Sequence, residues 1–215
     1  ERRVVFYVSG FGVFRCSGEM LDINPTDYLV QQLSECQDEL AGESFVVKFA
    51  KVSQVSAIDA LQTLLALQSC YNNERRKDDV SIFLHLGVSG KAKEFTLEQF
   101  AYNEAEWDTP DTKGWIPGKQ KITQEIDAPA QFPCQIPEMN ALKDLQCTQF
   151  PCCVSDDPGR YLCNYIYYNS LMLTKKEVNS FSLFVHVPLF GEIPAIEQKT
   201  QLLCLLSNLS KHILD

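Results

Sequence analysis

The stretch VSIFLHLGV, residues 80–88, decides the fold. It is apolar at nearly every position and reaches a glycine just before its end. A continuous run of this kind predicts a central strand that is covered on both faces, because a half-exposed strand would alternate with polar residues. Strand-like runs also occupy residues 4–9 and 45–52, and each is followed by a segment with helical spacing, at residues 24–40 and 55–67. Alternating strands and helices predict an α/β fold with a largely parallel sheet.

The first two helices are predicted from their start signals and their apolar positions. Asn24 is a good N-cap, and Pro25 suits the first helical position. The apolar residues that follow at helical spacing are Leu29, Leu33, Cys36 and Leu40. In the second helix the apolar stripe, which we expect to be the buried face, consists of Ile58, Leu61 and Leu65.

The second half of the chain is less regular. Residues 95–103 alternate weakly, and a Pro-rich insert at about residues 108–137 is expected to serve as a lid or binding loop. Beyond it the patterns predict a short helix at 139–145, a strand at 152–155, a helix at 160–173, a strand at 181–187 and a closing helix. The chain of 215 residues fits one domain, and we expect residues 1–215 to form it.

Charge and hydropathy exclude several classes of partner. The formal net charge is −9, and Arg75–Lys77 is the only basic cluster, which argues against nucleic acid or an anionic membrane surface. No stretch approaches the roughly 20 apolar residues that cross a bilayer, and the sequence does not begin with an apolar signal segment. We therefore expect a cytoplasmic protein.

Nine cysteines are present, without a CxxC spacing anywhere. A zinc site or a redox pair is therefore not expected, and a reducing cytosol would keep these residues as thiols. Several lie inside apolar runs, where a thiol behaves as a small buried hydrophobe. Most are expected to fill the core, so a functional cysteine needs a separate argument.

Residues 155–164, SDDPGRYLCN, supply that argument for Cys163. The segment predicts a strand, a sharp Pro-Gly turn and a helix with Cys163 in its first turn, while Asp156 and Asp157 suit the turn. Unpaired N–H groups at a helix start favour a thiolate and are able to form an oxyanion hole. From pattern alone, however, packing of Cys163 between helix and sheet is the more frequent outcome for such a cysteine.

A thiol nucleophile needs a base, and the chain has three histidines. His212 near the end of the last helix suits the helix dipole and is expected to be structural. His85 and His186 both lie within apolar strand runs, and the pattern leaves both open, with His186 closer to the end of its run. Glu98 interrupts an apolar run and is a candidate to orient the base, or else a solvated residue of an edge strand.

The turn GFGVF at residues 10–14 has two interpretations. It resembles a dinucleotide loop, but the third glycine of GxGxxG is missing because residue 15 is Arg. A nucleotide-binding α/β protein is therefore retained only as an alternative. Phe11 and Phe14 either belong to the core or form the walls of a flat apolar pocket.

Four segments, in order along the chain, resemble the type I pyroglutamyl peptidases. These are residues 10–14 with NPT at 24–26, HLGVSG at 85–90 with TLE at 96–98, GRYLCNY at 159–165 with Tyr168, and FVHVP at 184–188. The resemblance implies a three-layer α/β/α sandwich with a mostly parallel, mixed and twisted sheet. It also implies a catalytic triad of Cys163, His186 and Glu98, without a metal or an organic cofactor.

The same resemblance implies a substrate and a pocket. The expected activity is that of a cysteine exopeptidase that removes an N-terminal pyroglutamyl residue from peptides, working as a monomer or a homo-oligomer. Its lactam pocket would be lined by Phe11, Phe14, Val88, Tyr161 and Leu162. Aromatic walls suit an uncharged five-membered lactam. The alternative is a catalytically silent protein of the same fold that binds pyroglutamyl peptides.

The sequence departs from the family pattern at three places. Val13 stands where members commonly have Pro, and Pro158 stands where Ala is usual. The Arg that bacterial members carry after the equivalent of Asn103 is missing, and Glu104 follows instead. The insert at 108–137 matches the family poorly, so the resemblance leaves the reach of the site beyond the lactam open.

Overall fold

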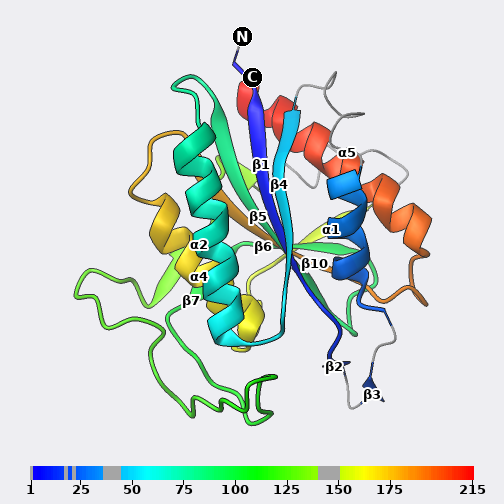
Figure 1. Ribbon diagram of the computed structural model, residues 1–215, viewed down its shortest axis with the longest axis vertical. Coiled ribbons are helices and arrows are strands. Elements are labelled where there is room, and N and C mark those ends of the chain that lie inside the picture. Colours follow the sequence, from blue (N-terminus) through cyan, green and yellow to red (C-terminus); the bar gives the residue numbers. More distant parts are fainter. Residues whose placement is uncertain (1, 17–18, 21–22, 36–44, 140–150) are drawn as a thin grey trace.

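A twisted sheet of six strands forms the centre of the computed structural model, which describes residues 2–16, 19–20, 23–35, 45–139 and 151–215 (Figure 1). The strands lie in the order β4, β1, β5, β10, β6, β9. Their bounds are Phe45–Ser53, Val4–Phe11, Val80–Val88, Ser180–Val187, Phe95–Glu98 and Cys152–Ser155, respectively. Only the β10–β6 pair is antiparallel within this sheet. The predicted α/β class with a mostly parallel, mixed sheet is confirmed.

Helices cover both faces of this sheet, which makes three layers (Figure 1). One face carries α1 (Pro25–Glu35) and α5 (Ala195–Leu214), whose apolar residues join one core cluster. The other face carries α2 (Ala57–Glu74) and α4 (Leu162–Thr174). Strand β5 lies third in the sheet and is buried at every position, as its continuous apolar sequence predicts.

The first helix starts where its sequence predicts. Asn24 Oδ1 accepts a hydrogen bond of 2.9 Å from the backbone N–H of Thr26, and Pro25 is the first helical residue. Leu29 and Leu33 are buried, whereas residues 36 and 40 lie outside the described ranges. None of the helices in the described part of the chain is long and apolar enough to span a bilayer.

The buried face predicted for the second helix is wrong. Ile58 and Leu65 are 61% and 60% exposed, and the residues that pack inward are Ala57, Ala60, Leu64, Leu67 and Tyr71. Both stripes have helical spacing, and they differ by about one residue in phase. The neighbouring stripe is the buried one because Tyr71 packs edge-on against Tyr7 and Phe83 of the sheet.

The insert is tied to the main sheet by a short ribbon. The weakly alternating residues 95–103 form β6 and a separate strand β7 (Phe100–Tyr102), which pairs antiparallel with β8 (Gln131–Pro133). Strand β8 therefore lies within the segment expected to be a loop at 108–137. Two further short strands, β2 (Arg15–Cys16) and β3 (Glu19–Met20), form a ribbon after β1. The helix predicted at 139–145 falls almost wholly outside the described residues.

Candidate active site

Cys163 is the second residue of α4, directly after a tight turn. Gly159 has φ +80°, a conformation that favours glycine, and its N–H donates to Asp157 Oδ1 over 3.0 Å. Arg160 binds the same carboxylate at 2.6 Å, so the residues of the turn hold one another. The helix begins at Leu162, two residues later than predicted, with Tyr161 as its N-cap.

The thiol of Cys163 lies against β5 at Gly87. A Cβ atom added to Gly87 would lie 2.9 Å from Cys163 Sγ and 2.6 Å from Phe184 Cζ. Both distances are far shorter than a normal contact, so this position accommodates only glycine. The missing side chain lets the helix bring the thiol down onto the carboxyl end of a central strand, where sites in α/β sheets form.

His186 and Glu98 form a buried pair on neighbouring strands. His186 Nδ1 lies 2.7 Å from Glu98 Oε1, and the two residues are 8% and 2% exposed. Strand β6 has β10 on one side and β9 on the other, so Glu98 is not a solvated residue of an edge strand. The carboxylate fixes the ring so that its other nitrogen, Nε2, is available to the thiol.

The pKa of His186 reflects these neighbours. Burial lowers the pKa of the imidazole, but the negative charge of Cys163 and hydrogen bonds to Cys163 and Glu98 outweigh it, and the pKa rises from 6.5 to about 10. Cys163 is thus one of the neighbours that act on the imidazole of His186. A cysteine, a histidine and a carboxylate grouped in this order are the residue types that a cysteine nucleophile with an acid–base partner requires.

The two other histidines lie apart from this group. His85 is fully buried on β5, and its Nδ1 lies 2.7 Å from Ser9 Oγ. Burial lowers its pKa to about 3, so the ring is neutral at physiological pH. His212 Nε2 contacts the carbonyl oxygen of Pro137 at 2.7 Å, near the end of α5. Of the two histidines that the pattern left open, His186 is the one paired with Glu98, so it stays the predicted base.

A small apolar pocket opens beside Cys163. Its lining comes from the strand ends, the turn after β1 and the start of α4, and consists of Phe11, Phe14, Val55, Val88, Tyr161, Leu162 and Cys163. All five residues predicted for a lactam pocket are in this set. Val55 was missed, although it follows the predicted strand 45–52, and residues beyond the carboxyl ends of parallel strands are general candidates.

Hydrogen bonds hold the glycine turn in place. The N–H of Phe11 donates to Thr26 Oγ1 over 2.9 Å, and the N–H of Gly12 donates to the carbonyl of Ser53 over 2.8 Å. Asn24 Nδ2 in turn donates to the carbonyl of Gly12. A phosphate-binding loop needs such N–H groups to point at its ligand. The N–H groups of Phe11 and Gly12 already donate to other parts of the protein, so they are not available to bind a phosphate. This argues against the nucleotide-binding alternative.

The insert supports the pocket with an aromatic cluster that sequence reasoning missed. Trp107 lies edge-on to Tyr161, a pocket residue, with ring centroids 5.1 Å apart, and to Trp115 at 5.0 Å. At the position of the missing Arg, the Glu104 carboxylate instead binds Arg160 Nε at 2.6 Å. The guanidinium of Arg160 also lies over the ring of Tyr102, 3.8 Å from its centroid.

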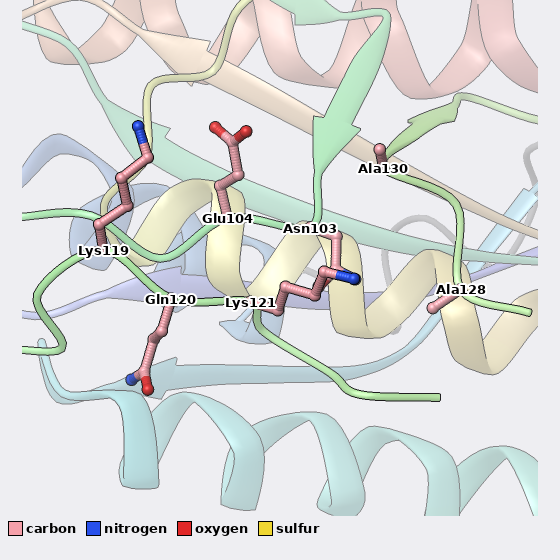
Figure 2. A pocket seen from close by; sticks show the side chains of 7 residues that line it. All are labelled: Asn103, Glu104, Lys119, Gln120, Lys121, Ala128 and Ala130. Carbon is pink, nitrogen blue, oxygen red and sulfur yellow. The ribbon is translucent and has the colours of Figure 1, made fainter. Parts of the chain in front are cut away.

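Another hollow lies where the insert meets residues 103 and 104, and it shares no lining residue with the pocket beside Cys163 (Figure 2). Its lining residues are Asn103, Glu104, Lys119, Gln120, Lys121, Ala128 and Ala130. Both polar ends of Asn103 are used by the backbone of Thr123, at 3.0 and 2.9 Å. Asn103 therefore shapes the insert by holding Thr123 through both ends of its side-chain amide.

The fold and this site define a class: an α/β protein with a cysteine at a helix start near a buried histidine–carboxylate pair, the residue set of a cysteine hydrolase. A family model described as pyroglutamyl peptidase matches residues 4–207. The chain belongs to this family of cysteine peptidases, as its resemblance implied.

Individual relatives and solved structures agree. The chain is 28% identical over 187 residues to pyrrolidone-carboxylate peptidase of Oceanobacillus iheyensis, which covers 82% of this chain and 85% of that protein. It is 32% identical to the Thermococcus litoralis protein of the same name over 108 residues, 50% of this chain and 48% of that one. The structure of the pyrrolidone carboxyl peptidase from Fervidobacterium islandicum matches with a TM-score of 0.77 at 23% identity, covering 96% of this chain and 98% of that one. This last likeness supports the fold.

Proposed function

We propose that this chain removes N-terminal pyroglutamyl residues from peptides, with Cys163 as nucleophile, His186 as acid and base, and Glu98 as the residue that orients the imidazole. One observation carries the proposal: Cys163 lines the apolar pocket and lies over β5 at Gly87, which pairs with His186 of the neighbouring strand β10. A substrate ring in the pocket would therefore present its exocyclic carbonyl to the thiol.

The reaction takes two steps. The Cys163 thiolate adds to the carbonyl carbon, the imidazolium of His186 gives its proton to the leaving amine, and the C–N bond breaks to leave a thioester. Water then attacks the thioester, its proton passes to the neutral imidazole, and pyroglutamate leaves with regeneration of the thiolate. Glu98, at 2.7 Å from Nδ1, stabilises the positive ring in both steps.

The start of α4 supplies donors for the oxyanion. Tyr161, the N-cap, gives no side-chain hydrogen bond to the first turn. The N–H groups of Leu162 and Cys163 come before the first intrahelical bonds, because an α-helix leaves its first N–H groups without partners. They are therefore suited to bind the negative oxygen of the tetrahedral intermediate.

The chemistry of the pocket favours a lactam over an ordinary N-terminus. Its lining side chains are apolar or aromatic apart from the thiol of Cys163. A free amino terminus carries a charge, and burying an unpaired charge among such groups is strongly unfavourable. Cyclisation to pyroglutamate removes this charge, so pyroglutamyl-terminated peptides are the proposed substrates.

We also propose that the protein works in the cytoplasm. Cys70, Cys134, Cys152, Cys153 and Cys163 carry reduced thiols in the structure. Reduced thiols in this number are typical of a compartment kept reducing by glutathione and thioredoxin. Fractionation of cells and detection of the protein with an antibody would test this location.

Hydrolysis of a fluorogenic pyroglutamyl amide tests the activity directly. The wild-type protein is expected to release the fluorophore, and the Cys163→Ala and His186→Ala variants are expected to be inactive while remaining folded by circular dichroism. A folded Cys163→Ala variant with wild-type activity would contradict the assignment. Binding of pyroglutamyl peptides without any hydrolysis by the wild type would instead favour a silent binding protein.

A further inference from the structure

Val55 belongs to two hollows at once. On one side it lines the pocket that contains Cys163. On the other it lines a more open hollow together with Gly12, Val13, Val52, Ser53, Gln54 and Thr112. Val55 is only 4% exposed, so its side chain fills the space between them. We call this more open hollow the outer hollow. Val55 is the residue that lines both the pocket beside Cys163 and the outer hollow.

The strand order places Val55 at the end of the pocket away from His186. Val55 follows β4, Phe11 ends β1, Gly87 under the thiol belongs to β5, and His186 belongs to β10. These strands are consecutive neighbours in the sheet. Neighbouring strands lie about 4.8 Å apart, so the ends of β4 and β5 are separated by roughly 10 Å. A ring attached to a carbonyl at Cys163 therefore extends across β1 toward Val55.

The direction of the leaving peptide follows from the same order. His186 has to reach the departing amine to protonate it, so the peptide leaves on the His186 side of the thiol. The outer hollow lies on the opposite side, behind the ring. It is therefore unsuited to hold the rest of the peptide, and Val55 is the lining residue that it shares with the pocket of the ring.

The insert fixes the backbone at Val55 and at Ala57, two residues further along the chain. The Val55 carbonyl accepts hydrogen bonds from the N–H and the Oγ1 of Thr112, at 3.0 and 3.1 Å. The carboxylate of Asp111 accepts a hydrogen bond of 3.0 Å from the N–H of Ala57. With its carbonyl and the start of α2 held by the insert, Val55 has little freedom to withdraw when a larger ring enters.

We propose that Val55 sets the ring size of the acyl group, and that it excludes lactams larger than the five-membered ring. This inference rests on the proposed function. The chemical class that tests it is the six-membered lactam acid, 6-oxopiperidine-2-carboxyl, which has the same amide and charge and one additional methylene. One methylene in a tight apolar pocket changes selectivity by roughly 10- to 200-fold.

Replacement of Val55 by alanine removes the wall and connects the two hollows. The experiment compares kcat/KM for the five- and six-membered lactam amides of aminomethylcoumarin. In Val55→Ala, the ratio of six- to five-membered activity is expected to rise by about tenfold or more. Two matched controls should leave this ratio within about twofold of wild type: Val55→Thr, which keeps the volume, and Val13→Ala, which changes the outer hollow only.

Binding of the free lactam carboxamides, measured by calorimetry, gives a readout that does not depend on catalysis. The affinity ratio is expected to shift in Val55→Ala as the kinetic ratio does. The proposal is overturned if both ratios stay within about twofold of wild type in a folded Val55→Ala protein, or if Val13→Ala shifts them equally. A wild-type protein that binds only the five-membered ring, without hydrolysing it, would refute the proposed function and leave the role of Val55 supported.

Discussion

Gly87 lies directly beneath the thiol of Cys163, so close that a Cβ atom on Gly87 would be 2.9 Å from Sγ. The same Cβ would also meet the ring of Phe184, which packs beside His186 with ring centroids 4.9 Å apart. One missing side chain on β5 thus leaves the space that Cys163 and Phe184 occupy, with Phe184 packed beside His186. Strand β5 thus contributes to the site because residue 87 has no side chain.

Gly87→Ala is therefore expected to reduce activity strongly. The methyl group forces Cys163 or Phe184 to move, and a displacement of about 1 Å at a reacting group lowers rates by about 100-fold. Overpacking also lowers the free energy of unfolding, by about 1–3 kcal/mol. Both quantities are measurable, as kcat on a pyroglutamyl amide and by thermal unfolding.

Gly191→Ala is the matched control for Gly87→Ala. A Cβ atom at Gly191 has no neighbour within 4 Å, so activity and stability should stay near wild type. Full activity of a Gly87→Ala protein would show that the thiol does not need its observed place against β5.

Glu98→Gln is expected to lower both kcat and the pH at which activity declines. The Glu98 carboxylate contributes to raising the pKa of His186 to about 10, so its removal lowers that pKa toward 6.5. The imidazolium that protonates the leaving amine is then lost at a lower pH. The alkaline limb of kcat/KM should shift to lower pH, and kcat should fall by about 100-fold or more.

A pH profile of kcat/KM between pH 5 and pH 10 checks this effect, with Glu94→Gln as a control because Glu94 does not bind His186. An unchanged alkaline limb in Glu98→Gln would mean that the carboxylate does not tune the imidazole.

The sequence predicts most of the sheet because burial on both faces leaves a direct pattern in it. The 80–88 run becomes β5, and residues 181–187 become β10 with one further residue at the start. The buried face of α2 was not predictable with the same certainty, because two apolar stripes with helical spacing compete. Only the packing of Tyr71 on the sheet decides between them.

The candidate site divides in the same way. The turn before Cys163 is formed by consecutive residues, so the sequence of that segment predicts it. The pairing of His186 with Glu98 depends on β6 lying antiparallel beside β10, a relationship between segments 88 residues apart along the chain. Asp111 holds its partners through contacts made only after folding, so its sequence neighbourhood carries no signal of this, and Val55 has only the general signal of a residue that follows a parallel strand.

Alkylation is expected to distinguish Cys163 from the buried cysteines. Burial raises the pKa of Cys134 and Cys153, and it raises that of Cys152 to about 11, so these thiols stay protonated at pH 7. The thiolate is the reactive form, so iodoacetamide should modify Cys163 before these three. Peptide mapping by mass spectrometry after a short reaction at pH 7 measures the order.

Loss of activity should follow the labelling of Cys163, and a lactam carboxamide should slow both. His186→Asn provides the control variant, because removal of the imidazolium removes the partner of the thiolate and should slow labelling. Equal labelling of Cys163 and Cys152 at pH 7 would argue against a specially reactive thiol.

Asp111 is expected to stabilise the protein by joining the insert to the start of α2. Its carboxylate accepts hydrogen bonds from the N–H groups of Ala57, Lys113 and Trp115, at 3.0, 2.9 and 2.9 Å. Asp111→Asn keeps the shape but places a donor where one carboxylate oxygen accepts. The free energy of unfolding should fall by about 1–3 kcal/mol, measured by chemical denaturation at pH 7.

The effect of Asp111→Asn should depend on pH with a definite sign. Burial raises the pKa of Asp111, but the backbone N–H groups outweigh it and hold the pKa below its ordinary value of 3.8. The native carboxyl therefore binds a proton less readily than the unfolded one, so its contribution is complete above pH 3.8 and declines as the pH falls through the native pKa. The difference in unfolding free energy between wild type and Asp111→Asn should accordingly shrink in strong acid.

Asp108→Asn, at an exposed position of the same insert, is the control and should show little effect on stability at any pH. A difference for Asp111→Asn that stays constant down to acid unfolding would show that the charge of this carboxylate does not hold the insert.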